Sequence, residues 1–418
     1  MKLSIVVIGD ELLLGRVTDT NSGFIARHFD ALGWEIASVE TVGDTREAIS
    51  SAIKRAMECS HLVITTGGLG PTKDDITKGV MTEIFGGEPI KNSEVLDNII
   101  NVFNLRGLKM NPLTADQAIV PSSCRVIQNR LGTAPIMVFE RDGRMLIAMP
   151  GVPFETEGML VSAVIPEVMS RFQPDTAIAH RTVIVTGITE SALAKQLEEF
   201  EASLPAGLHL AYLPTPGFIR LRLDGVGTDS SDIDSLADSY AAQLKQTLGS
   251  LMLYDGDGTP AEIVLTYLRR HGLTMATAES CTGGNIAHKI TEIAGCSDSY
   301  VGSVVSYSND VKTGLLGVSR DDLERYGAVS REVVEQMAAG ACRATGADCS
   351  VATSGIAGPG GGTPDKPVGT VWTAVCVKGQ VTSRLLRLPG NRSRVIERAT
   401  NEVLIALAQT LKASEDTN

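Results

Sequence analysis

The feature that most constrains the fold of this chain is the alternation of short, nearly continuous apolar segments with amphipathic ones. LSIVVIG (3–9) and HLVITT (61–66) are such apolar segments, and each precedes a stretch with helical periodicity. Strands buried on both faces belong to parallel sheets whose helical crossovers cover either side. The same alternation resumes near residue 260. We therefore predict an α/β fold with two three-layer α/β domains with mainly parallel sheets, joined by a small α+β domain.

Changes in this pattern predict the domain boundaries. We expect the first α/β domain over residues 1–170, with a hairpin turning on Asp142-Gly143 near its end. Alternating strands and helices of a different spacing indicate the small α+β domain over 171–254. LYDGDGTPAE (253–262) is rich in Gly and Asp and contains Pro, which is typical of a linker. The second α/β domain then covers 255–418.

Charge and cysteine usage exclude several classes of protein. The net charge is −12 and no stretch is rich in Lys or Arg, so nucleic acid is an unlikely partner. No apolar stretch approaches the roughly 18 residues needed to span a bilayer, so we expect no membrane partner. The seven cysteines are scattered without a Cys-x-x-Cys pair, which favours reduced thiols and a cytoplasmic location.

TTGGLGPTKDD (65–75) follows a buried strand and precedes a helix. Three glycines let its backbone approach a ligand: Gly67, Gly68 and Gly70. The loop lacks both the Walker A ending and the dinucleotide-binding spacing. Asp74 and Asp75 would repel a bare phosphate, and a divalent cation between carboxylate and phosphate would resolve that conflict. The alternative is that both acidic residues only stabilise the helix dipole.

TMATAESCTGGNIAHKI (274–290) places Ser280 where a strand runs into a helix, as either a nucleophile or an N-cap. His288 is eight residues further on, about 12 Å along a helix, which is too far for a hydrogen bond. His271 ends the preceding helix, where a cationic cap explains it. The GxSxG motif is absent. A histidine base is therefore not expected.

A second polar cluster, VVSYSNDVKTGLLGV (304–318), follows the next apolar strand. Tyr307, Asn309 and Lys312 leave the carboxyl end of that strand, where ligands bind in such sheets, so they can converge on Ser280. Lysine serves as a base when desolvation or a nearby cation lowers its pKa. The alternative is a surface lysine.

ATSGIAGPGGGTPDKPVGTVW (352–372) is a third candidate, with five glycines and three prolines among residues 355–367. Its many backbone donors suit a phosphate or a ribose, and the alternative is a flexible turn. Arg392 and Arg394 stand at a later helix start, against the usual dipole preference. Cations there make sense if an anion is shared with the helix terminus.

GDELLLG (9–15), TTGGLGPTKDD (65–75) and AMPGVPFE (148–155) resemble the amino-terminal domain of the CinA family, which is similar to the molybdopterin-binding MoaB/MogA fold. The resemblance implies hydrolysis of ADP-ribose to AMP and ribose 5-phosphate with a divalent cation, with or without a monovalent one. It assigns Asp74 and Asp75 to the metal. The nucleotide-binding residues that it implies are Asp10, Glu11, Gly68, Gly70, Thr72 and Glu155, with Gly151 and Pro153 at the rim.

AESCTGG, SYSNDVKTGLLGV, TSGIAGPGGG and a late arginine resemble the CinA carboxy-terminal domain, the nicotinamide-nucleotide amidase family. The resemblance implies hydrolysis of nicotinamide mononucleotide to nicotinic acid mononucleotide and ammonia, without a metal. It assigns catalysis to Ser280, Tyr307 and Lys312. The substrate-binding residues that it implies are Thr282, Gly283, Gly284, Asn309, Thr353, Gly355, Gly358, Gly360, Gly361 and Arg394.

Cys281 is the rival nucleophile, because a thiol is more reactive than a hydroxyl. Adjacent residues at a turn point in different directions, so only one faces the cleft, and the family resemblance selects Ser280. We expect the N–H groups of residues 281–284 to stabilise the oxyanion.

The resulting hypothesis is a homodimeric pyridine-nucleotide salvage enzyme that acts on nicotinamide mononucleotide and ADP-ribose. The alternatives are a molybdopterin-type cofactor-binding protein, or a competence or DNA-damage accessory protein without amidase activity.

Overall fold

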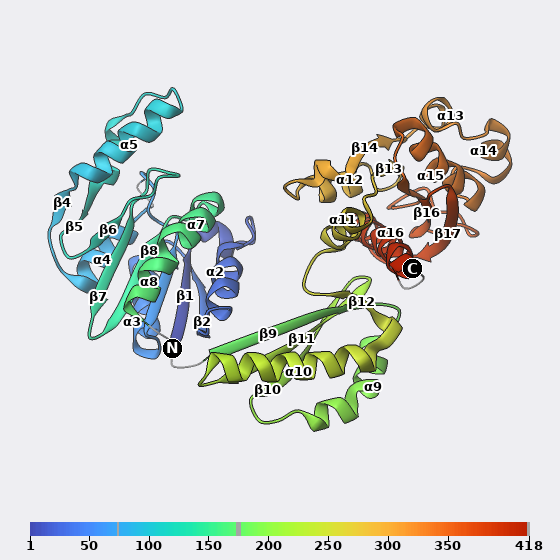
Figure 1. Cartoon of the computed structure of the whole chain (residues 1–418). Coiled ribbons are helices and arrows are strands. Elements are labelled where there is room, and N and C mark those ends of the chain that lie inside the picture. The colour runs from blue at the N-terminus through green and yellow to red at the C-terminus, as the bar shows by residue number, and fades with distance from the viewer. Residues whose placement is uncertain (73–74, 173–176, 416–418) are drawn as a thin grey trace. The chain divides into compact units, whose positions relative to one another are not determined.

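The structure is a computed structural model that divides into two compact units (Figure 1). It describes residues 1–72, 75–172 and 177–415. The first unit comprises Met1–Ala179 and Val226–Asp234, and the second comprises His180–Gly225 and Ser235–Asn418. Each unit is described by itself.

The first unit is built on a six-stranded sheet of order β2-β1-β3-β8-β7-β6. Its strands are β1 (Lys2–Ile8), β2 (Glu35–Val42), β3 (Leu62–Thr66), β6 (Arg125–Ile127), β7 (Ile136–Arg141) and β8 (Arg144–Met149). The strands β2, β1, β3 and β8 are parallel to one another. The pairs β8–β7 and β7–β6 are antiparallel. The predicted hairpin is confirmed, because Asp142 and Gly143 both have positive φ (54° and 73°) between β7 and β8.

Helices cover both faces of this sheet. Leu3, Ile5 and Val7 of β1 pack against α2 (Asn21–Asp30), α7 (Pro153–Met159), the π-helical turn Leu160–Val164 and α8 (Ile165–Arg171). Val6 and Ile8 pack instead against α3 (Arg46–Cys59) and α4 (Thr77–Phe85). One strand therefore buries alternate residues on opposite faces, which explains its nearly continuous apolar sequence.

Short elements complete the first unit. The helix α1 (Asp10–Leu13) follows β1 directly. A projection beyond the sheet contains β4 (Pro89–Lys91), α5 (Ser93–Leu105), α6 (Pro112–Ala115), a 3-10 turn at Asp116–Ala118 and β5 (Ile119–Pro121) (Figure 1).

The middle segment is an α+β domain, as predicted, with a four-stranded sheet of order β10-β11-β9-β12. Its elements are β9 (Ala177–Val185), α9 (Glu190–Ser203), β10 (Leu208–Thr215), β11 (Phe218–Gly227), α10 (Ser230–Leu248), a 3-10 turn at Gly249–Leu251 and β12 (Met252–Asp255). The strands β10 and β12 were not expected from the sequence.

The carboxy-terminal sheet has the order β14-β13-β15-β16-β17. Its strands are β13 (Met275–Glu279), β14 (Tyr300–Val305), β15 (Cys349–Gly355), β16 (Thr370–Val377) and β17 (Gln380–Arg387). The β13–β14 and β13–β15 pairs are parallel, and the two pairs made by β16 are antiparallel.

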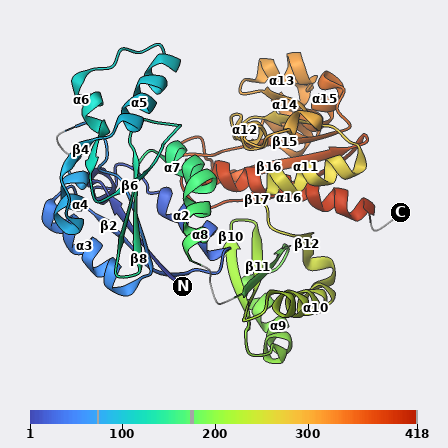
Figure 2. The ribbon, with the colours of Figure 1, turned by 60° about the vertical axis from the view of Figure 1, so that its left-hand side comes forward.

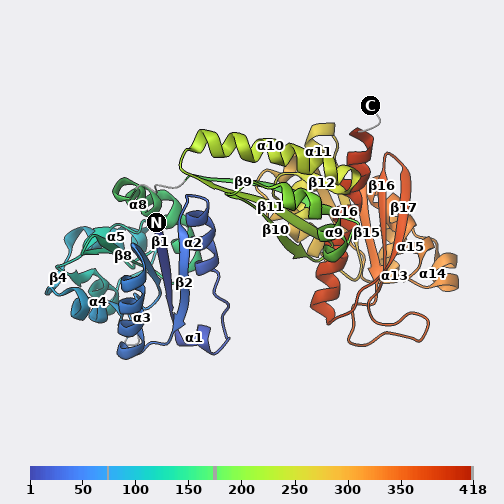
Figure 3. The same cartoon turned by 90° about the horizontal axis from the view of Figure 1, so that it is seen from below.

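Two layers of helices enclose that sheet. On one face α11 (Pro260–His271) lies alongside α16 (Arg392–Glu415) (Figure 2). On the other lie α13 (Asn309–Leu316), α14 (Arg320–Tyr326) and α15 (Arg331–Thr345), and Figure 3 shows the sheet between the two layers. The short α12 (Asn285–Thr291) and a 3-10 turn at Cys296–Asp298 follow β13. The predicted fold class is confirmed.

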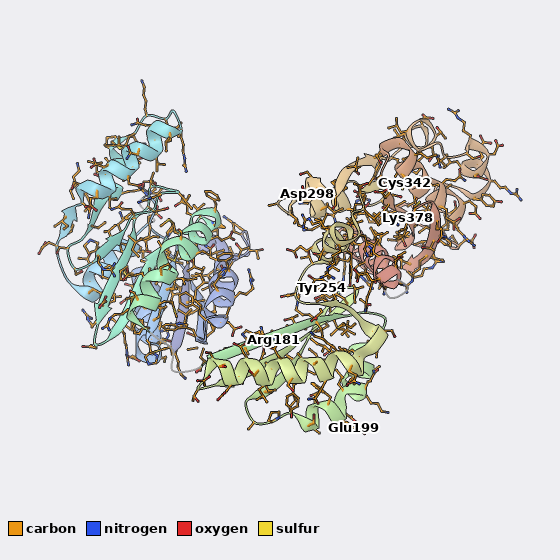
Figure 4. All side chains as sticks on the ribbon, in the orientation of Figure 1. Arg181, Glu199, Tyr254, Asp298, Cys342 and Lys378 are labelled. Atoms are coloured by element: carbon orange, nitrogen blue, oxygen red, sulfur yellow. The ribbon has the colours of Figure 1, made fainter. Side chains whose placement is uncertain are left out.

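The segment predicted as a linker is partly structural. Leu253 is only 2% exposed, and the Tyr267 hydroxyl of α11 donates to its carbonyl oxygen at 2.6 Å. Tyr254, labelled in Figure 4, makes an edge contact with the Tyr267 ring, with 6.2 Å between the ring centroids. Middle-domain side chains therefore extend the carboxy-terminal core.

Candidate functional site

Three neighbouring strand ends form the candidate site of the second unit. Because β14, β13 and β15 run parallel, their carboxyl ends meet at one edge of the sheet. Ser280 follows β13, and its N–H donates to the carbonyl oxygen of Thr353 on β15 at 3.0 Å. Ser306 follows β14, and its N–H donates to the Glu279 carbonyl oxygen at 2.8 Å. These bonds hold the ends of β13, β14 and β15 together. The prediction that residues after the second strand converge on Ser280 requires this arrangement.

Ser280 is in contact with a buried lysine. Nζ of Lys312 lies 3.1 Å from Oγ of Ser280 and 2.6 Å from the carbonyl oxygen of Ser306. Lys312 is 1% exposed, so the surface-lysine alternative is wrong. Burial lowers the pKa of Lys312, and among the described residues no carboxylate opposes that shift. A lysine in this environment can be neutral and accept a proton.

Glu279, which the sequence analysis missed, organises the turn after Ser280. Its side chain is fully buried, and its carboxylate accepts the N–H groups of Gly284 (3.0 Å), Ile286 (3.0 Å) and Ala287 (2.9 Å) at the start of α12. The helix N-terminus thus compensates the buried charge. An acidic residue directly before a predicted helix start was the available signal.

The oxyanion prediction is only partly compatible with this turn. The Gly284 N–H is bound to Glu279, and the Gly283 N–H donates to the Ser280 carbonyl oxygen at 3.2 Å. Those two donors are therefore occupied, and the prediction is wrong for them. The N–H groups of Cys281 and Thr282 bond to none of the residues that the structure describes. They are the remaining donors beside Ser280.

The side chains next to Ser280 face the interior. Cys281 is 6% exposed and packs among apolar residues that include Val371 and Leu386, and burial raises the pKa of its thiol to about 12. A thiol with so high a pKa is a poor nucleophile. The hydroxyls of Thr282 and Thr353, both predicted to bind substrate, instead hydrogen-bond to each other at 2.7 Å in the interior.

An arginine connects two of the predicted loops. Nη2 of Arg392 donates to the Tyr307 hydroxyl at 3.1 Å, and its Nη1 donates to the Gly358 carbonyl oxygen at 2.9 Å. The structure thus brings Tyr307 to Arg392 and not to Lys312. Arg392 and Arg394 are both exposed, but the guanidinium of Arg394 bonds to none of the described residues. Of these two arginines, Arg392 is therefore the one that contacts the loops carrying Tyr307 and Gly358.

The remaining predicted substrate-binding residues lie around these loops. Asn309 is the exposed first residue of α13. In the glycine loop Gly355 is half-buried and Gly358 is buried, whereas Gly360 and Gly361 are exposed. The loop therefore has a buried part beside Arg392 and a solvent-exposed part at Gly360 and Gly361.

The first unit contains a separate cavity of about 780 Å³ at the glycine loop. It lies at the carboxyl ends of β1, β3 and β8, the position predicted for a ligand in such a sheet. The predicted residues that line it are Asp10, Glu11, Gly68, Gly70, Thr72, Asp75, Gly151, Pro153 and Glu155. Asp74 lies outside the described residues.

The cavity is strongly acidic. The carboxylates that line it belong to Asp10, Glu11, Asp19, Asp44, Asp75 and Glu155, and Arg16 is the basic residue among the described lining side chains. Asp44, which the sequence analysis missed, exchanges backbone-to-carboxylate hydrogen bonds with Asp10 at 3.0 and 3.3 Å. Burial raises the pKa of Asp44, and the nearby negative charges of Asp10, Glu11 and Asp75 add to this. A bare phosphate would be repelled here.

Oxygen donors of this kind suit a hard divalent cation. Asp75 already accepts the Thr72 N–H at 2.9 Å and the Thr72 hydroxyl at 2.6 Å. In the described part of the chain no three His, Cys, Asp or Glu side chains are grouped closely enough to hold a metal ion. The chemistry of the lining fits the predicted cation, while a complete ligand set is not assembled from these residues.

Comparison with known proteins places these domains. Residues 4–170 match the family model "Probable molybdopterin binding domain", 180–252 match "Damage-inducible protein CinA KH domain", and 258–411 match "CinA C-terminal domain". The chain thus combines a molybdopterin-binding type of domain with a CinA carboxy-terminal domain.

Relatives align with nearly the whole chain. A CinA-like protein of Cytophaga hutchinsonii is 41% identical over 411 residues, covering 98% of this chain and 97% of the relative. A putative competence-damage inducible protein of Caldicellulosiruptor saccharolyticus is 38% identical over 413 residues, covering 98% and 99%. The competence/damage inducible protein CihA of Agrobacterium tumefaciens, a solved structure, is 41% identical, covering 36% of this chain and 96% of that one, with a TM-score of 0.35. This chain belongs to the CinA family.

The KH match of the middle domain was not anticipated from the sequence. KH domains clamp nucleotides with a Gly-x-x-Gly loop, and residues 180–252 contain no such spacing. The match therefore brings no nucleotide-clamping motif with it.

Along the part of the chain that the structure describes, no helix combines the length and the apolar character needed to cross a bilayer.

Proposed function

We propose that the second unit hydrolyses the carboxamide of nicotinamide mononucleotide to nicotinic acid mononucleotide and ammonia. The observation that carries this proposal is the 3.1 Å contact between Oγ of Ser280 and the buried Nζ of Lys312. A serine activated by a neutral lysine is a nucleophile for acyl transfer, and amide hydrolysis belongs to that class. Membership of the CinA family supports the nucleotide carboxamide as the substrate.

In the first half-reaction, Nζ of Lys312 takes the proton of the Ser280 hydroxyl as Oγ attacks the carboxamide carbon. The N–H groups of Cys281 and Thr282 are the donors left free for the developing oxyanion. Lys312 then gives its proton to the leaving ammonia. This leaves the nucleotide joined to Ser280 as an ester, and in the second half-reaction water attacks that ester with Lys312 again as the base.

Arg392 is the residue that we propose as the anchor for the 5′-phosphate. Its guanidinium already contacts Tyr307 and the Gly358 carbonyl oxygen, so it is positioned between two loops of the site. Charge-assisted contacts to a phosphate are strong and hold a substrate in a fixed orientation. Arg394, assigned to substrate by the family resemblance, is exposed at the start of the same helix.

An ammonia-release assay on nucleotides that carry carboxamides tests this proposal. Nicotinamide mononucleotide should release ammonia in the presence of a metal chelator. Nicotinamide riboside, which lacks the phosphate, should react far more slowly. Absence of ammonia from every carboxamide nucleotide, with a folded protein, would reject the amidase. Salt-dependent DNA binding in that case would favour the accessory-protein alternative.

A second activity is proposed for the cavity of the first unit, because the residues predicted for a nucleotide site line one cavity. We infer that it hydrolyses ADP-ribose to AMP and ribose 5-phosphate with a divalent cation. Asp75, with Asp74, would hold the ion, and the negative charge of Asp44 nearby would favour it. The ion would neutralise the pyrophosphate and activate water. Production of AMP that stops on chelation tests this activity. Tight binding of a molybdopterin without ADP-ribose hydrolysis would favour the cofactor-binding alternative.

A further inference from the structure

Glu279 is a buried carboxylate to which the proposed mechanism gives no part. It directly precedes the nucleophile Ser280, and its side chain is fully buried. Burying a charge is costly unless hydrogen bonds compensate it. The hydrogen bonds that compensate this charge therefore show which part of the site the carboxylate holds in place.

Glu279 fixes both ends of the turn that follows Ser280. At the first end, its carbonyl oxygen accepts the Ser306 N–H at 2.8 Å, which ties β13 to the end of β14. At the other end, its carboxylate accepts three backbone N–H groups at 2.9–3.0 Å, those of Gly284, Ile286 and Ala287. The backbone of residues 280–283 is thus held between two sets of hydrogen bonds made by one residue.

The same contacts decide which N–H groups of the turn stay unpaired. The Gly284 N–H is bonded to the Glu279 carboxylate, and the Gly283 N–H donates within the turn at 3.2 Å. Both glycines have positive φ (63° for Gly283 and 101° for Gly284), which lets the backbone turn back towards the carboxylate. The N–H groups of Cys281 and Thr282 bond to none of the residues that the structure describes. They are the donors proposed for the oxyanion.

We propose that Glu279 is a positioning residue of the amidase, which holds the turn so that the Cys281 and Thr282 N–H groups face the oxyanion. This inference rests on the proposed amide hydrolysis, and it names the residue that orients the donors. Because Glu279 is fully buried, it acts on the reaction only through the turn. A displacement of about 1 Å at a reacting group can lower a rate about 10²-fold.

A thioamide substrate separates this role from a merely structural one. Sulfur accepts hydrogen bonds more weakly than oxygen, so sulfur in place of the carboxamide oxygen weakens the contacts with the oxyanion donors. The unmodified full chain should turn over nicotinamide mononucleotide at least about tenfold faster than thionicotinamide mononucleotide. In Glu279→Gln this oxygen-to-sulfur ratio should fall towards one. For the oxygen substrate, kcat should fall about 10²-fold and KM should change little.

The variants are chosen to preserve the fold. Gln has nearly the volume of Glu, but its amide nitrogen cannot accept an N–H, so at least one of the three bonds is lost. Glu279→Asp keeps the charge on a shorter side chain and should also lower the ratio. Asn285→Ala is the matched control, because it removes the 2.9 Å hydrogen bond from Asn285 to Thr400 that ties the same helix α12 to α16. It should leave the ratio at the parental value.

Turnover with an unchanged oxygen-to-sulfur ratio in folded Glu279→Gln and Glu279→Asp overturns the inference and keeps the amidase. Equal rates for the two substrates in the unmodified protein also overturn it, whether or not the variants fold. Unfolding of both variants would assign Glu279 to stability alone and reject the positioning role. Absence of turnover of both substrates by the unmodified protein would instead reject the proposed function, and this inference with it.

Discussion

The two α/β domains place glycine loops at equivalent positions and surround them with different ionisable groups. In the first unit the loop after β3 opens on a cavity lined by six carboxylates and one arginine among its described residues. In the second unit the strand ends hold a buried Lys312 against Ser280, and no carboxylate among the described residues raises the pKa of that lysine. The difference shows that the strand ends determine where a ligand binds, while the local charge determines which chemistry follows.

Replacing Ser280 by Ala should have the largest effect. Essentially all ammonia release from nicotinamide mononucleotide should disappear, because the nucleophile is lost. Release of AMP from ADP-ribose should be unchanged if the two sites are independent. Cys281→Ala is the matched control and should retain most of its turnover, because that thiol is buried with a raised pKa. An active Ser280→Ala variant together with an inactive Cys281→Ala variant would show that Cys281 is the nucleophile.

Lys312→Met should reduce ammonia release about 10²–10⁴-fold, the usual contribution of a general base. Met preserves much of the buried volume, so the fold should persist. Steady-state kinetics would show the loss mainly in kcat. A variant with nearly full kcat would show that another group takes the Ser280 proton.

The pH dependence gives an independent test of this lysine. Burial lowers the pKa of Lys312, so kcat should fall as the pH decreases through that lowered value and Nζ becomes charged. The folded protein binds this proton less readily than the unfolded chain. The lysine therefore destabilises the fold below its lowered pKa, and the penalty disappears as pH rises towards the ordinary value of 10.5. Lys312→Met should remove this component from the free energy of unfolding, measured by denaturant titration.

Asp44→Asn should weaken the cation site of the first unit and leave the amidase unaffected. Removing one of the facing carboxylates should raise the Mg²⁺ concentration for half-maximal ADP-ribose hydrolysis by about tenfold. Asp97→Asn, on the exposed side of α5, is the control. An unchanged Mg²⁺ dependence would remove Asp44 from the cation site.

The smallest effect concerns the two arginines at the start of α16. Arg392→Ala should raise KM for nicotinamide mononucleotide about tenfold with little change in kcat, because a binding contact is lost. Arg394→Ala should change KM much less, because its guanidinium bonds to none of the described residues, whereas Arg392 bonds to Tyr307 and to the Gly358 carbonyl oxygen. A larger effect at Arg394 would restore the assignment made from the family resemblance.

Local patterns were sufficient to predict much of the fold. The Asp142-Gly143 turn and the apolar strands depend on neighbouring residues, and the pattern reveals such features. By contrast, β12 pairs with β9, which is distant in sequence, and β10 pairs with its neighbour β11 across a tight turn. Such strands carry weak local signals.

The candidate sites show the same limit. The nearness of Ser280 and Lys312 followed from strand order, because parallel neighbours end at one edge. The roles of Glu279 and Asp44 depend on hydrogen bonds that form only after folding. The pairing of Thr282 with Thr353 likewise needed three-dimensional information, because sequence order does not reveal which way a side chain points.

The central claim, that Ser280 forms an ester with the nucleotide carboxamide, is tested most directly by acid-quenching the reaction and mapping the adduct by mass spectrometry. We expect a nicotinoyl mononucleotide adduct on the peptide that carries Ser280. It should persist in Cys281→Ala and be absent from Ser280→Ala. An adduct on Cys281, or ammonia release by Ser280→Ala at the parental rate, would contradict the account.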